Sequence, residues 1–201
     1  MRSANRKSAG FSLIEFLVAA GLGGVSLALI GSVFISAQRV AQEKSQQLYL
    51  LQSLTSTFQT VEEDIQRAGY DGGLGAVLKL SAAADVIQVS GASEFGMAYY
   101  RDEVGLTDFR NVRYRLSDNK LQVCEQSSTS KNTLLTLNSV GNCRSLLDDG
   151  VVDVTSFAIS STPLSSASTD SSLWHLFIIA ATKDGQHSQT LKVDIKQRNW
   201  Q

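Results

Sequence analysis

Hydrophobic residues form one unbroken run near the N-terminus. From Phe11 to Ala37 the only charged residue is Glu15, and the next charge along the chain is Arg39. A bilayer span needs about 20 predominantly apolar residues, whereas a secretory signal peptide has an apolar core of only about 7–15 residues with its cleavage site behind it. The run therefore predicts a transmembrane helix over residues 11–38.

A two-faced pattern follows this run. Large apolar residues recur in steps of three and four, which indicates one stripe of an amphipathic helix: Leu51, Leu54, Phe58, Val61 and Ile65. No proline interrupts the chain before Ala68. We therefore expect a single helix from Phe11 to Ala68 that ends at Gly69, since glycine is a favoured helix terminator. Its second half, residues 39–69, should lie with the stripe against a globular domain.

The remaining chain, residues 70–201, alternates short apolar runs with turn residues. The runs predict strands, and they are Ala76–Leu80, Val86–Ser90, Met97–Tyr100, Val112–Leu116, Leu121–Cys124, Val151–Ile159, Leu173–Thr182 and Gln189–Ile195. Ser117–Lys120 and Thr182–Gln186 separate neighbouring runs as hairpin turns do. We expect a mostly antiparallel sheet packed on the second half of the helix, an α+β architecture. Two serine-rich stretches, Ser127–Ser130 and Ser160–Ser172, are predicted to be exposed loops.

Charge is distributed unevenly around the apolar run. Residues 1–10 carry Arg2, Arg6 and Lys7 and no acidic residue. Lysine and arginine stay on the cytoplasmic side of a membrane, so we expect this end inside and the globular domain in the periplasm. The net charge of −1 gives no electrostatic case for binding nucleic acid.

The two cysteines, Cys124 and Cys143, both follow the apolar run and are not in a Cys-x-x-Cys motif. In an oxidising compartment they predict a disulfide. On the loop-entropy account such a bond stabilises the fold by about 3 kcal/mol. Without export, two unpaired buried thiols are the alternative.

Residue patterns for catalysis or metal binding are not found. The acids Asp148, Asp149 and Asp153 do not form the Asp-x-Asp-x-Asp-Gly pattern of a calcium loop. His175 and His187 have no cysteine or glutamate at zinc-ligand spacing. The chain also has no Gly-x-Ser-x-Gly and no phosphate-binding glycine loop. We therefore expect no metal, no cofactor and no enzymatic activity.

The start of the apolar run carries a specific motif, Gly10-Phe11-Ser12-Leu13-Ile14-Glu15. It resembles the prepilin cleavage and methylation motif of type IV pilins and type II secretion pseudopilins. The resemblance implies cleavage between Gly10 and Phe11 by a prepilin peptidase, followed by N-methylation of the new Phe11 amine. It also implies that Glu15 forms an ion pair with the amine of a neighbouring subunit during assembly. Residues 1–10 would then be a leader peptide.

A second resemblance lies at the predicted end of the helix. The segment Asp64-Ile65-Gln66-Arg67-Ala68-Gly69-Tyr70, together with Ser36-Ala37-Gln38-Arg39, is similar to minor pilins of the PilW and prepilin-peptidase-dependent protein B group. This group implies the type IV pilin fold and a part in initiating pilus assembly. It also implies that the protein waits in the inner membrane and then enters the fibre, at or near the tip. The implied partners are prepilin peptidase, other minor and major pilins, the inner-membrane assembly platform and the lipid bilayer.

Two other hypotheses fit part of these patterns. A minor pseudopilin of type II secretion, of the J kind, would share the fold, and genomic neighbours would separate it from a pilin. A single-span, membrane-anchored periplasmic protein that binds or catalyses would keep its N-terminus uncleaved. The mass of the mature N-terminus distinguishes this last hypothesis from the other two.

Overall fold

The computed structural model describes residues 12–73, 75–103, 106–165 and 170–198. Within these residues the α-helix α1 spans Leu13–Arg67, which confirms the predicted long helix. The chain divides into two units, residues 1–45 and 46–201. In the first unit α1 is long and apolar enough to cross a membrane, with a mean hydropathy of 2.2 over its most apolar window and none of that window buried.

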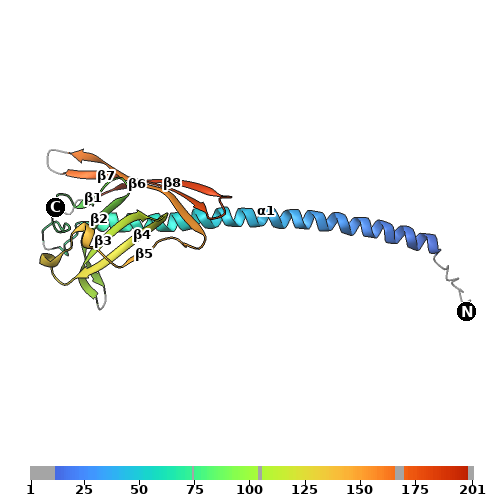
Figure 1. Cartoon of the computed structure of the whole chain (residues 1–201), viewed down its shortest axis with the longest axis horizontal. Helices are drawn as coiled ribbons and strands as arrows, with labels where there is room; N and C mark the ends of the chain where they lie inside the picture. The colour runs from blue at the N-terminus through green and yellow to red at the C-terminus, as the bar shows by residue number, and fades with distance from the viewer. Residues whose placement is uncertain (1–11, 74, 104–105, 166–169, 199–201) are drawn as a thin grey trace, which may run out of the picture. The chain divides into compact units, whose positions relative to one another are not determined.

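The second unit contains the end of α1 and two antiparallel sheets (Figure 1). The first sheet has the order β1-β2-β3-β4-β5, with β1 at Ile87–Val89, β2 at Glu94–Glu103, β3 at Leu106–Ser117, β4 at Lys120–Ser128 and β5 at Cys143–Ser145. The second has the order β6-β7-β8, with β6 at Val152–Ser165, β7 at Asp170–Thr182 and β8 at Ser188–Lys196. Two 3-10 helices, η1 at Lys131–Thr133 and η2 at Leu137–Ser139, lie between β4 and β5. The α+β arrangement and the antiparallel pairing are as predicted, but the strands form two sheets instead of one.

One core joins α1 to both sheets. The apolar stripe predicted on α1 is buried from Leu54 to Ile65. Its first buried residue is Leu50 and not the predicted Leu51, which is 43% exposed. Leu50 lies four residues before Leu54 and Leu51 lies three residues before it. Both spacings place a residue on the same face of a helix, so periodicity does not distinguish them. From the sheets, Phe95 stacks on Tyr114 and on Phe157, so aromatic rings of β2, β3 and β6 meet in this core.

The predicted strand at Ala76–Leu80 is wrong. Leu78 and Leu80 are buried, which gives the segment the alternation of a strand. Its backbone, however, forms hydrogen bonds with a helix end and a loop instead of with a neighbouring strand. The Leu78 N–H donates to the carbonyl of Gly69 at 2.9 Å, and the Ser81 N–H just beyond it donates to that of Leu135 at 2.9 Å. The segment therefore lies extended between the end of α1 and a loop.

The serine-rich stretches lie in part in strands and not in the loops that the sequence predicts. Ser127 and Ser128 are the last residues of β4. Residues 160–165 pair with residues 170–175 as the far end of the β6–β7 ribbon, while residues 166–169 lie outside the described part. Backbone ladders do not depend on side-chain polarity, so strands exposed on their outer face can have the composition of a loop.

Gly69 ends α1 in a left-handed conformation, with φ of +84°. A Cβ at this position would lie 2.8 Å from Cγ1 of Val86. The Gly69 N–H donates to the carbonyl of Ala98 at 3.0 Å, and the Tyr100 N–H donates to that of Tyr70 at 2.7 Å. The end of the helix is thus joined directly to β2, and only glycine fits both the conformation and the space.

We predict that Gly69→Ala lowers the free energy of unfolding by about 2–3 kcal/mol, because it adds a steric clash to the strain of a left-handed alanine. Gly73→Ala is the matched control. Gly73 has the same φ of +84°, but nothing lies within 4 Å of the place that a Cβ would take, so only the left-handed strain of about 1 kcal/mol applies. Urea unfolding of the full chain in detergent measures both. Equal losses for the two variants would contradict the role of the contact with Val86.

Candidate assembly site and buried anchor of the helix

Glu15 lies in the first turn of α1. Its Oε2 accepts a hydrogen bond from the backbone N–H of Ser12 at 3.2 Å, across three residues. This is half of a capping box, in which a glutamate satisfies one of the free N–H groups at a helix start. A carboxylate is also favoured there by the helix dipole. The predicted cleavage site, Gly10 and Phe11, lies outside the described residues.

A second carboxylate, Asp64, is buried near the other end of α1 and is only 2% exposed. The hydroxyls of Tyr99 and Tyr114 donate to it at 2.7 and 2.5 Å, and Nη1 of Arg110 lies 3.1 Å from its Oδ1. Arg110 also donates to the hydroxyl oxygen of Tyr99. Three side chains from β2 and β3 therefore converge on one carboxylate of the helix.

Two further ion pairs connect this cluster to the surface by way of β4. Arg110 pairs with Glu125 at 2.7 Å, and Glu125 pairs with the exposed Arg144 at 3.0 Å. The row Asp64, Arg110, Glu125, Arg144 alternates in sign and sums to zero. Because each buried charge has an opposite neighbour, none is left uncompensated in the interior.

Burial sets the protonation of the groups around Asp64. It raises the pKa of Tyr114 well above its ordinary value, and the charge of Asp64 raises it further. The pKa of Tyr99 is raised by the same two causes. Burial alone would lower the pKa of Arg110, but the charges of Asp64 and Glu125 outweigh it and raise that pKa. Both phenols are therefore neutral donors and the guanidinium stays charged at neutral pH.

Sequence analysis missed this anchor, although the sequence carries a signal for it. Asp64 lies three residues after Val61 and directly before Ile65, on the stripe that the periodicity predicts to be buried. An acidic residue on a buried stripe requires partners. The neighbouring Arg67 instead forms an exposed pair with Glu63 at 3.7 Å, and such pairs contribute little.

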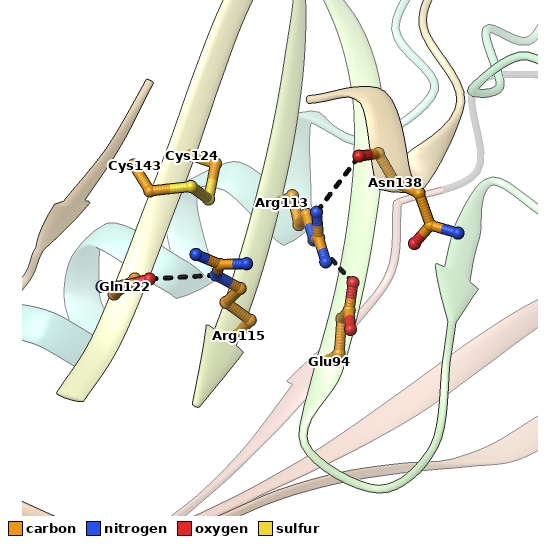
Figure 2. Close-up of a disulfide and its surroundings, with 7 residues drawn as sticks. All are labelled: Glu94, Arg113, Arg115, Gln122, Cys124, Asn138 and Cys143. Atoms are coloured by element: carbon orange, nitrogen blue, oxygen red, sulfur yellow. Dashed lines mark hydrogen bonds and ion pairs between the residues drawn. A yellow bond between two sulfur atoms is a disulfide. The ribbon is translucent and has the colours of Figure 1, made fainter. Parts of the chain in front are cut away.

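Cys124 and Cys143 form the predicted disulfide (Figure 2). They lie opposite each other on β4 and β5. A second cluster of buried residues surrounds Cys124 on the sheet face that turns away from α1, and it consists of Leu80, Ala98, Leu137 and Val140. The bond therefore fixes the chain between β4 and β5 over that face.

Polar side chains surround the disulfide on the same face. Arg113 pairs with Glu94 at 2.5 Å and donates to the backbone carbonyl of Asn138 at 3.4 Å, as Figure 2 shows. Arg115 donates to Oε1 of Gln122 at 2.9 Å. These contacts connect β2, β3 and β4 to η2. The side chains around the disulfide therefore have a structural role.

Two protein-family models match the chain. Residues 5–31 match the prokaryotic N-terminal methylation motif. Residues 43–199, most of the chain, match prepilin peptidase-dependent protein B. The chain belongs to the prepilin peptidase-dependent protein B family. No curated protein and no solved structure matches it.

Membership of the prepilin peptidase-dependent protein B family makes this a type IV pilin-like protein, processed by prepilin peptidase. Such families are structural and not enzymatic. In this family member Asp64, Gly69 and Tyr70 all act at the junction of α1 with β2 and β3. That gives the motif at the helix end a physical role.

One further polar row was not foreseen from the sequence. On the exposed face of β6, β7 and β8, His175 contacts Asp194 through Nδ1 at 2.7 Å and Thr162 through Nε2 at 2.9 Å. The order of hydroxyl, imidazole and carboxylate is that of a catalytic triad. His175 lies on the middle strand β7, whose backbone pairs with both β6 and β8, so its own N–H is not an oxyanion-hole donor. In the described chain, no three His, Cys, Asp or Glu side chains gather as a metal site.

We predict that Asp64→Asn lowers the free energy of unfolding by about 3 kcal/mol, because the buried Arg110 loses one of its two carboxylate partners. The control is Glu63→Gln on the exposed face of the same turn, for which we expect a change below about 0.5 kcal/mol. Urea unfolding of the full chain in detergent measures both. A loss for Asp64→Asn no larger than that of the control would show that the anchor contributes nothing.

We also predict a loss of stability at high pH. The folded state holds the pKa values of Tyr99 and Tyr114 above the ordinary value of 10.0, so it favours the neutral phenols. This stabilisation is complete below pH 10 and decreases as the pH rises further, by about 1.4 kcal/mol per pH unit for each tyrosine. Unfolding at pH 9, 10 and 11 measures the slope, and tyrosinate absorbance reports ionisation.

In a Tyr99→Phe, Tyr114→Phe double variant the slope should be shallower than in the wild type. The difference between the two slopes removes the contribution of lysines and other groups that titrate in the same range. Ionisation of all five tyrosines in the still folded wild-type protein would contradict this prediction.

Proposed function

We propose that this protein is a minor pilin that takes part in initiating type IV pilus assembly. Residues 1–10 are its leader peptide, residues 11–38 its membrane and assembly segment, residues 39–69 the amphipathic half of its helix, and residues 70–201 its periplasmic domain. Before assembly it resides in the inner membrane with a single span. It then enters the fibre, at or near the tip.

The observation that carries the proposal is a carboxylate in the first turn of a helix whose apolar side chains are uncovered. In the part of the chain that the structure describes, the Glu15 carboxylate accepts one hydrogen bond, from the N–H of Ser12. The residues around it are large and exposed, and they include Leu13, Ile14, Phe16 and Leu17. An ionised carboxylate in the apolar part of a bilayer is costly, and residues of this kind usually have a functional partner.

Cleavage after Gly10 creates such a partner. The new amine of Phe11 keeps its positive charge after methylation, so the amine of one subunit can neutralise Glu15 of the next. A subunit that docks without forming the pair leaves one charge uncompensated, at a cost of about 3–5 kcal/mol. Glu15 therefore acts as a selection step: correctly docked subunits are retained and misdocked ones are released.

The glycines of the apolar segment support close docking. At Gly21, Gly23, Gly24 and Gly31 a Cβ would meet no described atom within 4 Å. The chain's own packing therefore does not require glycine at these positions. In lipid, small residues let neighbouring helices approach closely and pack along their backbones.

We predict that Glu15→Ala leaves membrane insertion and cleavage intact but lowers the amount of this protein in sheared pili by at least about tenfold, as expected when an ion pair is lost. Glu43→Ala is the control, because Glu43 is an exposed acid of the same helix outside the apolar segment. Immunoblots of membrane and pilus fractions give both amounts. Wild-type levels of Glu15→Ala in pili would contradict the ion pair.

The initiating role has its own test. Deletion of the gene should reduce the number of surface pili, and the wild-type copy should restore it. Unchanged pili together with a loss of type II secretion would instead identify a pseudopilin.

A further inference from the structure

The strand β8 forms a long edge of the second sheet. It is the last strand in the order β6-β7-β8, and it pairs with β7 over nine residues without a shift in register. It contains no proline and no glycine. Every second backbone N–H and C=O group of such a strand points away from its neighbour. Among the described residues, these outer groups of β8 form no hydrogen bond with any other segment.

The other edge strands of the two sheets are short or covered. β1 and β5 have three residues each. On β6, the N–H of Ile159 donates to the carbonyl of Ala92 at 2.9 Å, and that of Val154 donates to the carbonyl of Asn119 at 2.8 Å. Further along β6, Pro163 has no N–H to offer. Proteins shorten or cover their edge strands because an open edge pairs with other chains. The open edge of β8 is therefore a candidate pairing site.

The inner face of β8 leaves apolar surface at this edge. Ile195 is fully buried, whereas Leu191 and Val193 are only partly buried, although both pack against the core. A strand added beside β8 would lie about 4.7–4.9 Å away. Its inward-pointing side chains would cover the exposed sides of Leu191 and Val193. Every second residue of such a strand is therefore expected to be apolar.

The outer face of β8 carries two lysines without a carboxylate partner. The acid between them, Asp194, contacts Nδ1 of His175 at 2.7 Å. Lys192 lies over the ring of Phe177, and neither Lys192 nor Lys196 forms an ion pair among the described residues. Four residues of a strand span about 13 Å. Two carboxylates at the same spacing on an added strand would each lie beside one lysine, and opposite charges across a strand pair are stabilising.

We propose that the outer edge of β8 pairs with an extended segment of a partner protein. In this segment apolar and polar residues alternate, and two carboxylates lie four residues apart. In strand addition of this kind, backbone hydrogen bonds supply the affinity and the side chains select the partner. Lysines on an edge strand also prevent pairing with unsuitable strands. Here they exclude basic strands and admit acidic ones.

A second copy of this chain does not fit the edge. β8 runs in the same direction as α1, because His187 before it lies 3.1 Å from Gln46, and Arg198 after it donates to Gln66 at 3.4 Å (Figure 1). Two β8 strands paired antiparallel would place their α1 helices in opposite directions. The proposed function inserts all copies with the same orientation, and this step rests on it. Parallel pairing would place the lysine row of one copy beside the apolar row of the other.

A synthetic peptide tests the edge in the full chain in detergent. The probe has nine residues and blocked ends, with valine at every second position and two glutamates four residues apart on the other face. Its counterpart has lysines in place of the glutamates. We expect the glutamate peptide to bind at least about fivefold more tightly at physiological ionic strength, measured by fluorescence anisotropy. Equal affinities of the two peptides would overturn the proposal.

Hydrogen exchange distinguishes strand pairing from attraction between charges alone. Saturating glutamate peptide should slow exchange at about half of the β8 amides by at least about tenfold, because only every second N–H faces the added strand. Exchange in β6 should not change. Binding that leaves the β8 amides unaffected would show that the peptide does not pair with this edge.

Reversal of one charge gives a control against misfolding. Lys196→Glu should weaken binding of the glutamate peptide by about fivefold and tighten binding of the lysine peptide. Lys131→Glu, an exposed site on η1, should change neither affinity. A damaged fold cannot produce the gain in affinity for the lysine peptide. If Lys196→Glu has the same effect as Lys131→Glu, the lysines of β8 do not select the partner.

Photo-cross-linking in living cells tests the natural partner. A benzophenone amino acid replaces Thr190, an exposed residue of β8. Mass spectrometry should find it joined to a segment that alternates apolar and polar residues and has two carboxylates four residues apart. Lys196→Glu should lower the yield by about fivefold, and Lys131→Glu should not. A product that joins β8 of two copies of this chain would contradict the proposal.

The edge proposal and the proposed function fail in different ways. If neither peptide slows exchange in β8, the edge proposal is wrong and the minor-pilin function stands, because pilus number is measured independently. If deletion of the gene leaves piliation unchanged, the proposed function is wrong whatever the peptides show.

Discussion

The fold of the second unit, residues 46–201, depends on the hydrogen bonds and ion pair that one buried carboxylate forms. Apolar contacts hold a helix on a sheet but tolerate small rotations and slides, whereas hydrogen bonds to a charge are directional. Asp64 accepts from Tyr99 of β2 and from Tyr114 of β3, and Arg110 joins it to Glu125 of β4. These bonds fix the rotation of α1 against three successive strands at once. Five residues after Asp64, the hydrogen bond from the Gly69 N–H to the carbonyl of Ala98 fixes the position of β2 along the helix axis.

Glu15 and Asp64, two acidic residues of α1, are satisfied in opposite ways. Asp64 has all its partners within the chain and is inaccessible. Within the described residues, Glu15 has one local partner, the Ser12 N–H, and the apolar side chains around it are uncovered. A charged group whose partners all lie within the chain helps to specify the fold. A charged group with few partners within the chain is available to pair with a neighbouring subunit. The same helix thus carries an internal anchor near one end and, on the proposed function, an assembly contact at the other.

Periodicity alone was enough to predict α1, its buried stripe and most of the strands, because these follow from which side chains are apolar. It could not show which backbone groups pair. The segment Ala76–Leu80 has the burial pattern of a strand, yet it bonds to a helix end and a loop. Ser160–Ser172 has the composition of a loop, yet its described parts extend the β6–β7 ribbon. Asp64 was missed for a related reason: its partners are 35 to 50 residues away, and only the fold brings them together.

Among the described residues, most of the large apolar side chains that the chain leaves exposed lie on α1. The sheets cover one stripe of its second half and leave the hydroxyl-rich flank at Tyr49–Thr60 open. The apolar side chains of its first half are uncovered, and Glu15 accepts a hydrogen bond from the start of its own helix. Exposure of a membrane-length apolar run to water is costly. In a bilayer the apolar run is favourable, and on the proposed function Glu15 gains its partner from a neighbouring subunit, while the sheets hold the second half of the helix.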